Sequence, residues 1–260
     1  VLLLPTALMG ATLPCLADLA ADAHDDDNAA GVGILYAANT MGAVVGTLLA
    51  TFVMFPLLGV FKTNLAAALL DATVGVVAIA WWWRRGRPGP MVVSAVTAGQ
   101  PSRLMLAPLV AYGLSGAVAM ALEVLWTRAL SMVLGSSIHA FSLMLASFLM
   151  GLAVGARLAS SHWASSREPI RALSVVLGLT ALAAFAGTWL IDGLPSVVLL
   201  IARARNLDEW FMWAGMLLCS GAVMFPAAVG FGAVLPCALR AASPSGSSEN
   251  LGDLVGRAYA

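Results

Sequence analysis

Seven long apolar stretches, separated by short polar segments, account for most of the chain. They cover residues 1–17, 31–60, 64–83, 104–133, 138–160, 172–201 and 210–239. An α-helix needs about 20 mostly apolar residues to cross the hydrocarbon of a bilayer, and each stretch is close to that length or longer. The alternating strands of a membrane β-barrel would leave a much weaker pattern. The chain is therefore predicted to be all-α, a polytopic transmembrane helix bundle of about seven spans.

The composition favours lipid over water as the solvent of these stretches. Hydrophobic residues make up 61% of the 260 residues and charged residues only 10%, with a mean hydropathy of +0.93. A soluble domain carries roughly 25% charged residues. The 13 basic and 13 acidic residues cancel, so net charge indicates no partner, and no nucleic-acid partner is expected. The expected partner is the lipid bilayer.

The basic residues concentrate in alternate loops. On one side of the predicted membrane the loops hold nine basic residues: Arg84, Arg85, Arg87, Arg103, Arg157, Arg167, Arg171, Arg240 and Arg257. On the opposite side they hold only Lys62, Arg203 and Arg205, with Arg128 near that end of its helix. Because basic loops stay on the cytoplasmic side, the segment 84–103 is placed in the cytoplasm. Trp81 to Trp83 directly precede it, as expected where a helix leaves the hydrocarbon.

A repeat relates the two ends of the chain. GATLPC at 10–15 recurs as GAVLPC at 232–237, and GILYA at 33–37 recurs as GRAYA at 256–260. The offsets are 222 (232 − 10) and 223 (256 − 33) residues, so residues 1–17 match the seventh stretch and the chain ends just inside an eighth. Internal repeats are typical of secondary transporters.

The repeat predicts how the chain is organised. Residues 1–83 hold the last three helices of a first repeat unit, and residues 84–103 form the basic cytoplasmic linker. Residues 104–260 hold the first four helices of a second unit and the start of the next helix. A six-plus-six plan with a basic central loop is that of the major facilitator superfamily. The expected fold is therefore major-facilitator-like, a fragment with about seven spans plus a stub.

Four blocks of sequence resemble one family. They are LPTALMGATLP at 4–14, LYAANTMGA at 35–43, EVLWTR at 123–128 and LGSSIHAFS at 134–142. Together they resemble the membrane region of bacterial fused major-facilitator/spermidine-synthase-like proteins. The resemblance implies a multi-pass protein of the bacterial inner membrane. It also implies a downstream aminopropyltransferase-like domain, which nothing within these residues matches and which is expected beyond Ala260.

The chain itself offers no enzyme chemistry. It contains no Ser/His/Asp triad, phosphate-binding loop, HExxH or CxxC, and Cys15, Cys219 and Cys237 have neither metal-ligand nor paired spacing. The aspartate run 25–27 has a single histidine beside it and is interpreted as a solvated loop. No catalytic residue, metal or cofactor is expected here, although the parent protein is expected to be an aminopropyltransferase if the resemblance extends to it.

Two acids inside apolar stretches are the leading candidates for a substrate or proton site. Glu123 and Asp71 lie where an ionised carboxylate is expensive, so each must be protonated, paired or facing a polar cavity. For Glu123 the alternative is a structural role, in a fixed pair with Arg128 or in hydrogen bonds to Ser115, Thr127 or another helix.

Three further residues are weaker candidates, each with a structural alternative. Arg128 is either an anchor at the outer interface or a gating group, and Asn39 either packs helices together or contacts solute. His139 is either a pH-sensitive group or a loop or cap histidine. The pairs Gly42/Gly46 and Gly151/Gly155 have the spacing that lets helices approach closely.

Three functions fit these residues. The first is a transport module for a small cationic, polyamine-like solute. The second is a membrane anchor or scaffold that does not transport and holds the downstream aminopropyltransferase-like domain. In the third, the parent protein makes polyamines and the membrane part delivers substrate or releases product.

Overall fold

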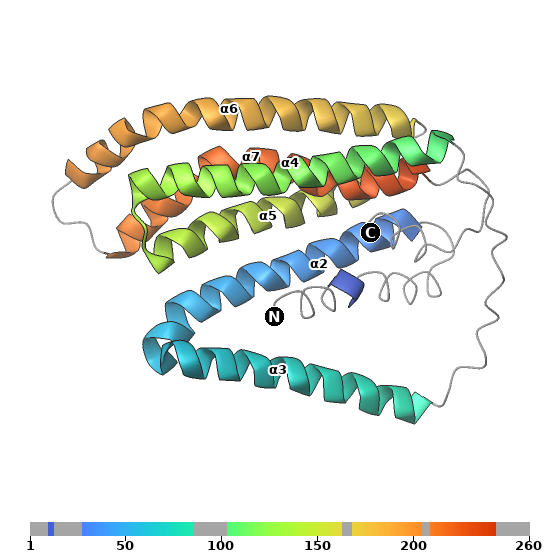
Figure 1. Cartoon of the computed structure of the whole chain (residues 1–260), viewed down its shortest axis with the longest axis horizontal. Helices are drawn as coiled ribbons and strands as arrows, with labels where there is room; N and C mark the ends of the chain where they lie inside the picture. The colour runs from blue at the N-terminus through green and yellow to red at the C-terminus, as the bar shows by residue number, and fades with distance from the viewer. Residues whose placement is uncertain (1–9, 13–27, 86–102, 163–167, 204–208, 243–260) are drawn as a thin grey trace.

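The computed structural model describes residues 10–12, 28–85, 103–162, 168–203 and 209–242, and helices account for nearly all of them (Figure 1). In chain order the elements are α2 (Asn28–Leu49), the π-helix η1 (Ala50–Met54), α3 (Phe55–Arg85), α4 (Arg103–Leu134), α5 (Ile138–His162), α6 (Pro169–Arg203) and α7 (Glu209–Ala242). The all-α prediction is confirmed. The predicted stretch 1–17, apart from Gly10–Thr12, and the stub of the next helix lie outside the described residues.

The long helices match the predicted apolar stretches to within a few residues at almost every boundary. Within the described residues, five helical runs are long and apolar enough to cross a membrane: Gly31–Arg84, Leu106–Leu134, Ile138–Ser161, Pro169–Leu200 and Glu209–Ala242. At 1.5 Å per residue, the 35 residues of α6 extend about 50 Å, well beyond a hydrocarbon core of about 30 Å. These helices indicate an integral membrane protein.

The first run folds back on itself. Helix α2 leads into η1, and Gly59 breaks the following helix with φ 74° and ψ 169°. A positive φ costs glycine little because it lacks a Cβ. Figure 1 shows α2 and α3 as the two arms of a V that meets at this region.

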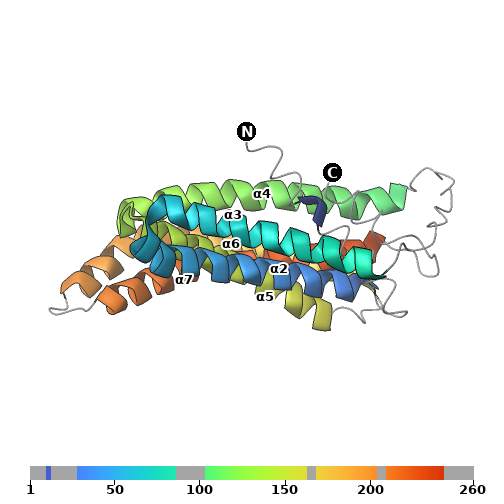
Figure 2. The same ribbon diagram turned by 90° about the horizontal axis from the view of Figure 1, so that it is seen from below.

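Helices α5 and α7 form the centre of the bundle. The bundle buries 72% of the most apolar 18-residue segment of α7 and 56% of that of α5. In the other three apolar runs it buries only 11–17% of the corresponding segment. Helix α7 packs against α4, α5 and α6, and α2 packs along α5 (Figure 2). The largest buried side chains of this core include Trp126, Phe148, Met144 and Met224.

Glycines allow the backbones of α5 and α7 to touch. A Cβ on Gly155 would overlap the carbonyl oxygen of Val229, and a Cβ on Gly232 would overlap that of Leu152. A Cβ on Gly151 would lie 2.5 Å from that of Ala228. The predicted close approach at Gly151/Gly155 is confirmed, whereas Gly42 has nothing within 4 Å among the described residues.

Helix α3 stands apart from the rest. Its only substantial packing within the described residues is against η1. Nearly all its described side chains are exposed, and Figure 1 shows the helix diverging from α2. Helix α3 is therefore the described element that lacks a packed neighbour along most of its length.

The ends of the helices alternate between the two ends of the bundle. In Figures 1 and 2, the end of α3 and the starts of α4 and α6 lie at one end, with the last turns of α5 and α7. The turn at Gly135, with φ 91°, and the start of α7 lie at the other. This is the alternation on which the predicted orientation depends. We call the two ends the linker end and the turn end.

Replacing Gly155 with Ala should destabilise the bundle. The new methyl group must displace the backbone of α7, and overpacking of this kind costs about 1–3 kcal/mol. Thermal unfolding in detergent micelles would show a lower midpoint for Gly155→Ala than for the unsubstituted protein. Gly42→Ala is the matched control, because its methyl group meets nothing within 4 Å. Equal midpoints for the two variants would contradict the close approach of α5 and α7.

Candidate functional site

Glu123 lies on the side of α4 that faces the bundle. It comes four residues after Ala119 and three before Trp126, a spacing that places all three on one helix face, and both neighbours are buried. The carboxylate itself is half-buried. Trp126 is fixed one turn further on, where its indole N–H donates a 3.2 Å hydrogen bond to the Thr188 hydroxyl of α6.

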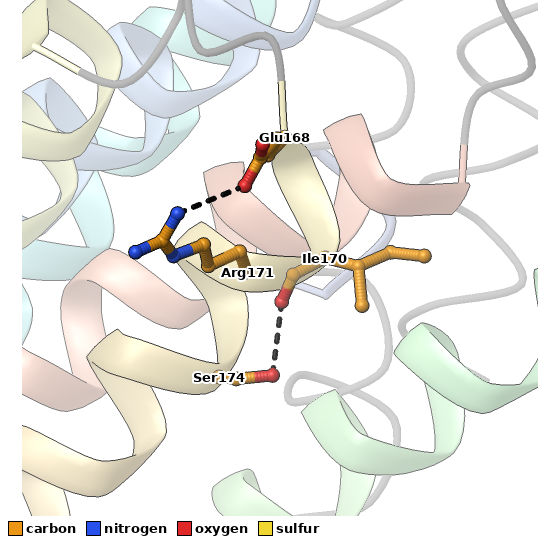
Figure 3. A network of polar contacts seen from close by, with 4 residues as sticks. All are labelled: Glu168, Ile170, Arg171 and Ser174. Carbon is orange, nitrogen blue, oxygen red and sulfur yellow. Dashed lines mark hydrogen bonds and ion pairs between the residues drawn. The ribbon is translucent and has the colours of Figure 1, made fainter.

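No ion pair or hydrogen bond joins Glu123 to another described residue. The salt bridge found in the described part of the chain joins Arg171 to Glu168, at the start of α6 (Figure 3). Of the structural alternatives predicted for Glu123, the pair with Arg128 and the bonds to Ser115 and Thr127 are therefore not formed, and a bond to another helix is absent among the described residues. The carboxylate lies in an apolar span with no protein group to neutralise it among these residues.

Asp71 occupies a different environment. It lies midway along α3, and its side chain is exposed. Because α3 does not pack against α4, the structure does not bring Asp71 and Glu123 into one site.

Arg128 and Asn39 are also exposed. Arg128 lies on α4 near the turn end, where its side chain has room to extend toward the interface. Asn39 points away from the packed side of α2, while its neighbour Thr40 is buried and donates to the Tyr36 carbonyl of the same helix. Neither Arg128 nor Asn39 contacts Glu123 through a hydrogen bond or ion pair.

Buried hydroxyl groups connect α2–η1, α5 and α7. Thr51 of η1 and Ser142 of α5 lie 2.6 Å apart between their oxygens, and Ser147 of α5 and Ser220 of α7 lie 3.2 Å apart. All four side chains are buried. We call them the hydroxyl seam. Ser147 and Ser220 also bond the Leu143 and Leu217 carbonyls of their own helices. Hydroxyl pairs of this kind join helices in lipid.

His139 belongs to an aromatic cluster at the turn end. Its ring stacks on Trp213 of α7, with centroids 5.5 Å apart and planes 9° apart, and meets Phe52 of η1 edge-on at 5.2 Å. Phe52 and Trp210 each meet Trp213 at 5.0 Å. The helix cap that sequence analysis considered for this histidine belongs instead to Ser137, whose hydroxyl accepts from the Ala140 N–H at 3.1 Å. His139 thus helps to hold η1 against α5 and α7.

Two grooves lined by described residues do not suit a cation. The first, of about 350 Å³, lies between α4 and α6 and is also lined by Phe231 of α7, and its polar contributions are the Ser115 and Thr180 hydroxyls. A second groove, of about 250 Å³, lies between α5, α6 and α7. Thr180 also lines this groove and donates to the Val176 carbonyl at 2.7 Å. Both grooves are otherwise lined by apolar and glycine residues.

Sequence reasoning missed three features of this region. It did not identify η1, the hydroxyl seam or Asp192, an exposed acid in α6 that no described residue pairs. Pro56 and Gly59 signalled an irregular helix near η1, and Asp192 could have been found as a third acid in an apolar stretch. The seam had no sequence signal, because serine and threonine occur throughout the apolar stretches.

Comparison of the chain with protein-family models, with curated proteins and with solved structures finds no match in any of the three.

Cysteines at Thr51 and Ser142 should form a disulfide bond. The hydroxyl oxygens already lie 2.6 Å apart, so the two sulfur atoms can reach bonding distance with small rotations. A protease site inserted in the linker 86–102 would make the bond visible. After oxidation and cleavage, the two fragments should migrate together on a non-reducing gel. Asn39→Cys combined with Ser142→Cys is the control, since Asn39 points away from the packed side of α2. Separation of the fragments in the Thr51/Ser142 variant would contradict the packing of η1 on α5.

Proposed function

We propose that this chain is the membrane module of a spermidine-synthase-like fusion protein of the bacterial inner membrane, with a major-facilitator-like fold, and that it transports a small cationic, polyamine-like solute. The supporting observation is Glu123, a half-buried carboxylate on the bundle side of α4 with no partner among the described residues.

The charge of Glu123 needs a partner from outside the described residues. An ionised acid at the centre of a membrane helix costs about 2.5–3.5 kcal/mol even on the most lenient scales. A bound proton or a bound ammonium group each removes that cost. A site that alternates between the two would couple the entry of a cationic solute to the release of a proton.

The contact between the predicted units adds support. Helix α2 and η1 belong to the first unit, 1–83, while α5 and α7 belong to the second, 104–260. The Thr51–Ser142 bond and the contacts of Phe52 with His139 and Trp213 therefore join the two predicted units. Transporters built from repeats bind solute at the interface between them, often beside interrupted helices. The π-helix η1 is such an interruption.

One observation favours the scaffold as a second candidate. The contact between α2 and α5 is tight at both ends. At the linker end, a Cβ on Gly33 would overlap the Ser160 hydroxyl and lie 2.9 Å from Pro236, and at the turn end Thr51 bonds Ser142. A contact closed at both ends suits a rigid support for a downstream domain.

Glu123→Gln in the full protein should lower solute uptake by roughly 30-fold or more, because the loss of one partner of a buried charge pair costs about 2–5 kcal/mol. Uptake of a labelled polyamine into proteoliposomes would measure the change. Asp192→Asn is the matched control, an exposed acid in a membrane helix whose neutralisation should leave uptake near the original rate. Unchanged uptake in the glutamine variant, with normal insertion, would refute the role of Glu123. Absence of uptake in the unsubstituted protein would favour the scaffold.

A further inference from the structure

The end of α3 at the linker end carries three consecutive exposed tryptophans. Trp81, Trp82 and Trp83 expose 57%, 52% and 73% of their surface. Successive residues of an α-helix point about 100° apart, so the three rings face three different sides. A single neighbouring helix cannot cover them all. If one helix packs along α3, at least one indole therefore remains open to the membrane.

Among the described residues, no acid neutralises the positive charge of Arg84, which follows these rings. Arg84 is exposed and has no ion pair or hydrogen bond with the described residues. Arg85 and Arg87 follow it, and the sequence contains no acidic residue between Asp71 and Glu123. Arg171 provides the contrast at the same end of the bundle, since its guanidinium lies 3.2 Å from the Glu168 carboxylate (Figure 3).

We infer that this end of α3 binds the headgroup of an acidic phospholipid. The phosphate lies against Arg84, to which Arg85 and Arg87 add positive charge in the sequence, and the tryptophan rings lie at the level of the glycerol and ester groups. Tryptophan is enriched at that depth of the bilayer, and the arginine fork matches two oxygens of a phosphate. Acidic lipid is the occupant that the charge requires, because basic residues next to a membrane helix each strengthen binding to acidic lipid about fivefold. This inference does not depend on the proposed transport function.

Quenching of tryptophan fluorescence by brominated lipid would test the inference. The protein is reconstituted in phosphatidylcholine vesicles that contain increasing fractions of dibrominated phosphatidylglycerol or dibrominated phosphatidylcholine. The quenching that disappears on replacing Trp81, Trp82 and Trp83 with Phe belongs to this end of α3. Phosphatidylglycerol should be preferred over phosphatidylcholine by roughly 25-fold, from two arginines at about fivefold each.

Substitution of the arginines separates this site from general attraction to the membrane. Arg84→Gln/Arg85→Gln should remove the preference, while Arg84→Lys/Arg85→Lys should keep it to within about threefold because the charge remains. Arg171→Gln is the control, since its charge is already paired, and it should leave the preference unchanged. An equal preference in the double glutamine variant, or no preference in the unsubstituted protein, would overturn the inference. Loss of the preference on adding 10 mM inorganic phosphate at constant ionic strength would also overturn it, since the site would then select the free anion.

Discussion

The contact between α5 and α7 is the interaction on which the rest of the bundle depends. Between membrane helices there is little hydrophobic driving force, since lipid tails are as apolar as the side chains, and close packing must supply the attraction instead. Gly155 and Gly232 let the backbone of each helix touch the other. The packing of α4 and α6 on α7, and of α2 on α5, follows from that central pair.

The helices could be predicted well from sequence, whereas most of their contacts, apart from the close approach at Gly151/Gly155, could not. In lipid every backbone group must be bonded within its own segment, so an apolar stretch becomes a helix whatever its neighbours are. The predicted stretch 138–160 and helix α5 (Ile138–His162) accordingly agree closely. The bond between Thr51 and Ser142 joins residues 91 positions apart, and the stacking of His139 on Trp213 joins different helices. Such contacts depend on the relative rotation of helices, which a hydrophobic pattern does not specify.

The candidate site, too, could be predicted only in part from the sequence. Glu123 could be selected from sequence because an acid in an apolar stretch is unusual, and its position on the packed face of α4 agrees with a role inside the bundle. Asp71 had the same sequence signal, yet it lies on the exposed surface of α3. What separates the two acids is the packing around each helix. That information enters only with the tertiary structure.

The account rests on helices that cross the bilayer, with the turn at Gly135 on one side and the ends of α5 and α7 on the other. Labelling of single cysteines in intact cells by a membrane-impermeant maleimide tests this most directly, in a Cys15→Ala background in which Cys219 and Cys237 are buried. Both target positions, Ser136 and Ser161, are exposed. The account predicts that Ser136→Cys is labelled in intact cells and that Ser161→Cys is labelled only after permeabilisation. Equal labelling of both cysteines in intact cells would contradict it.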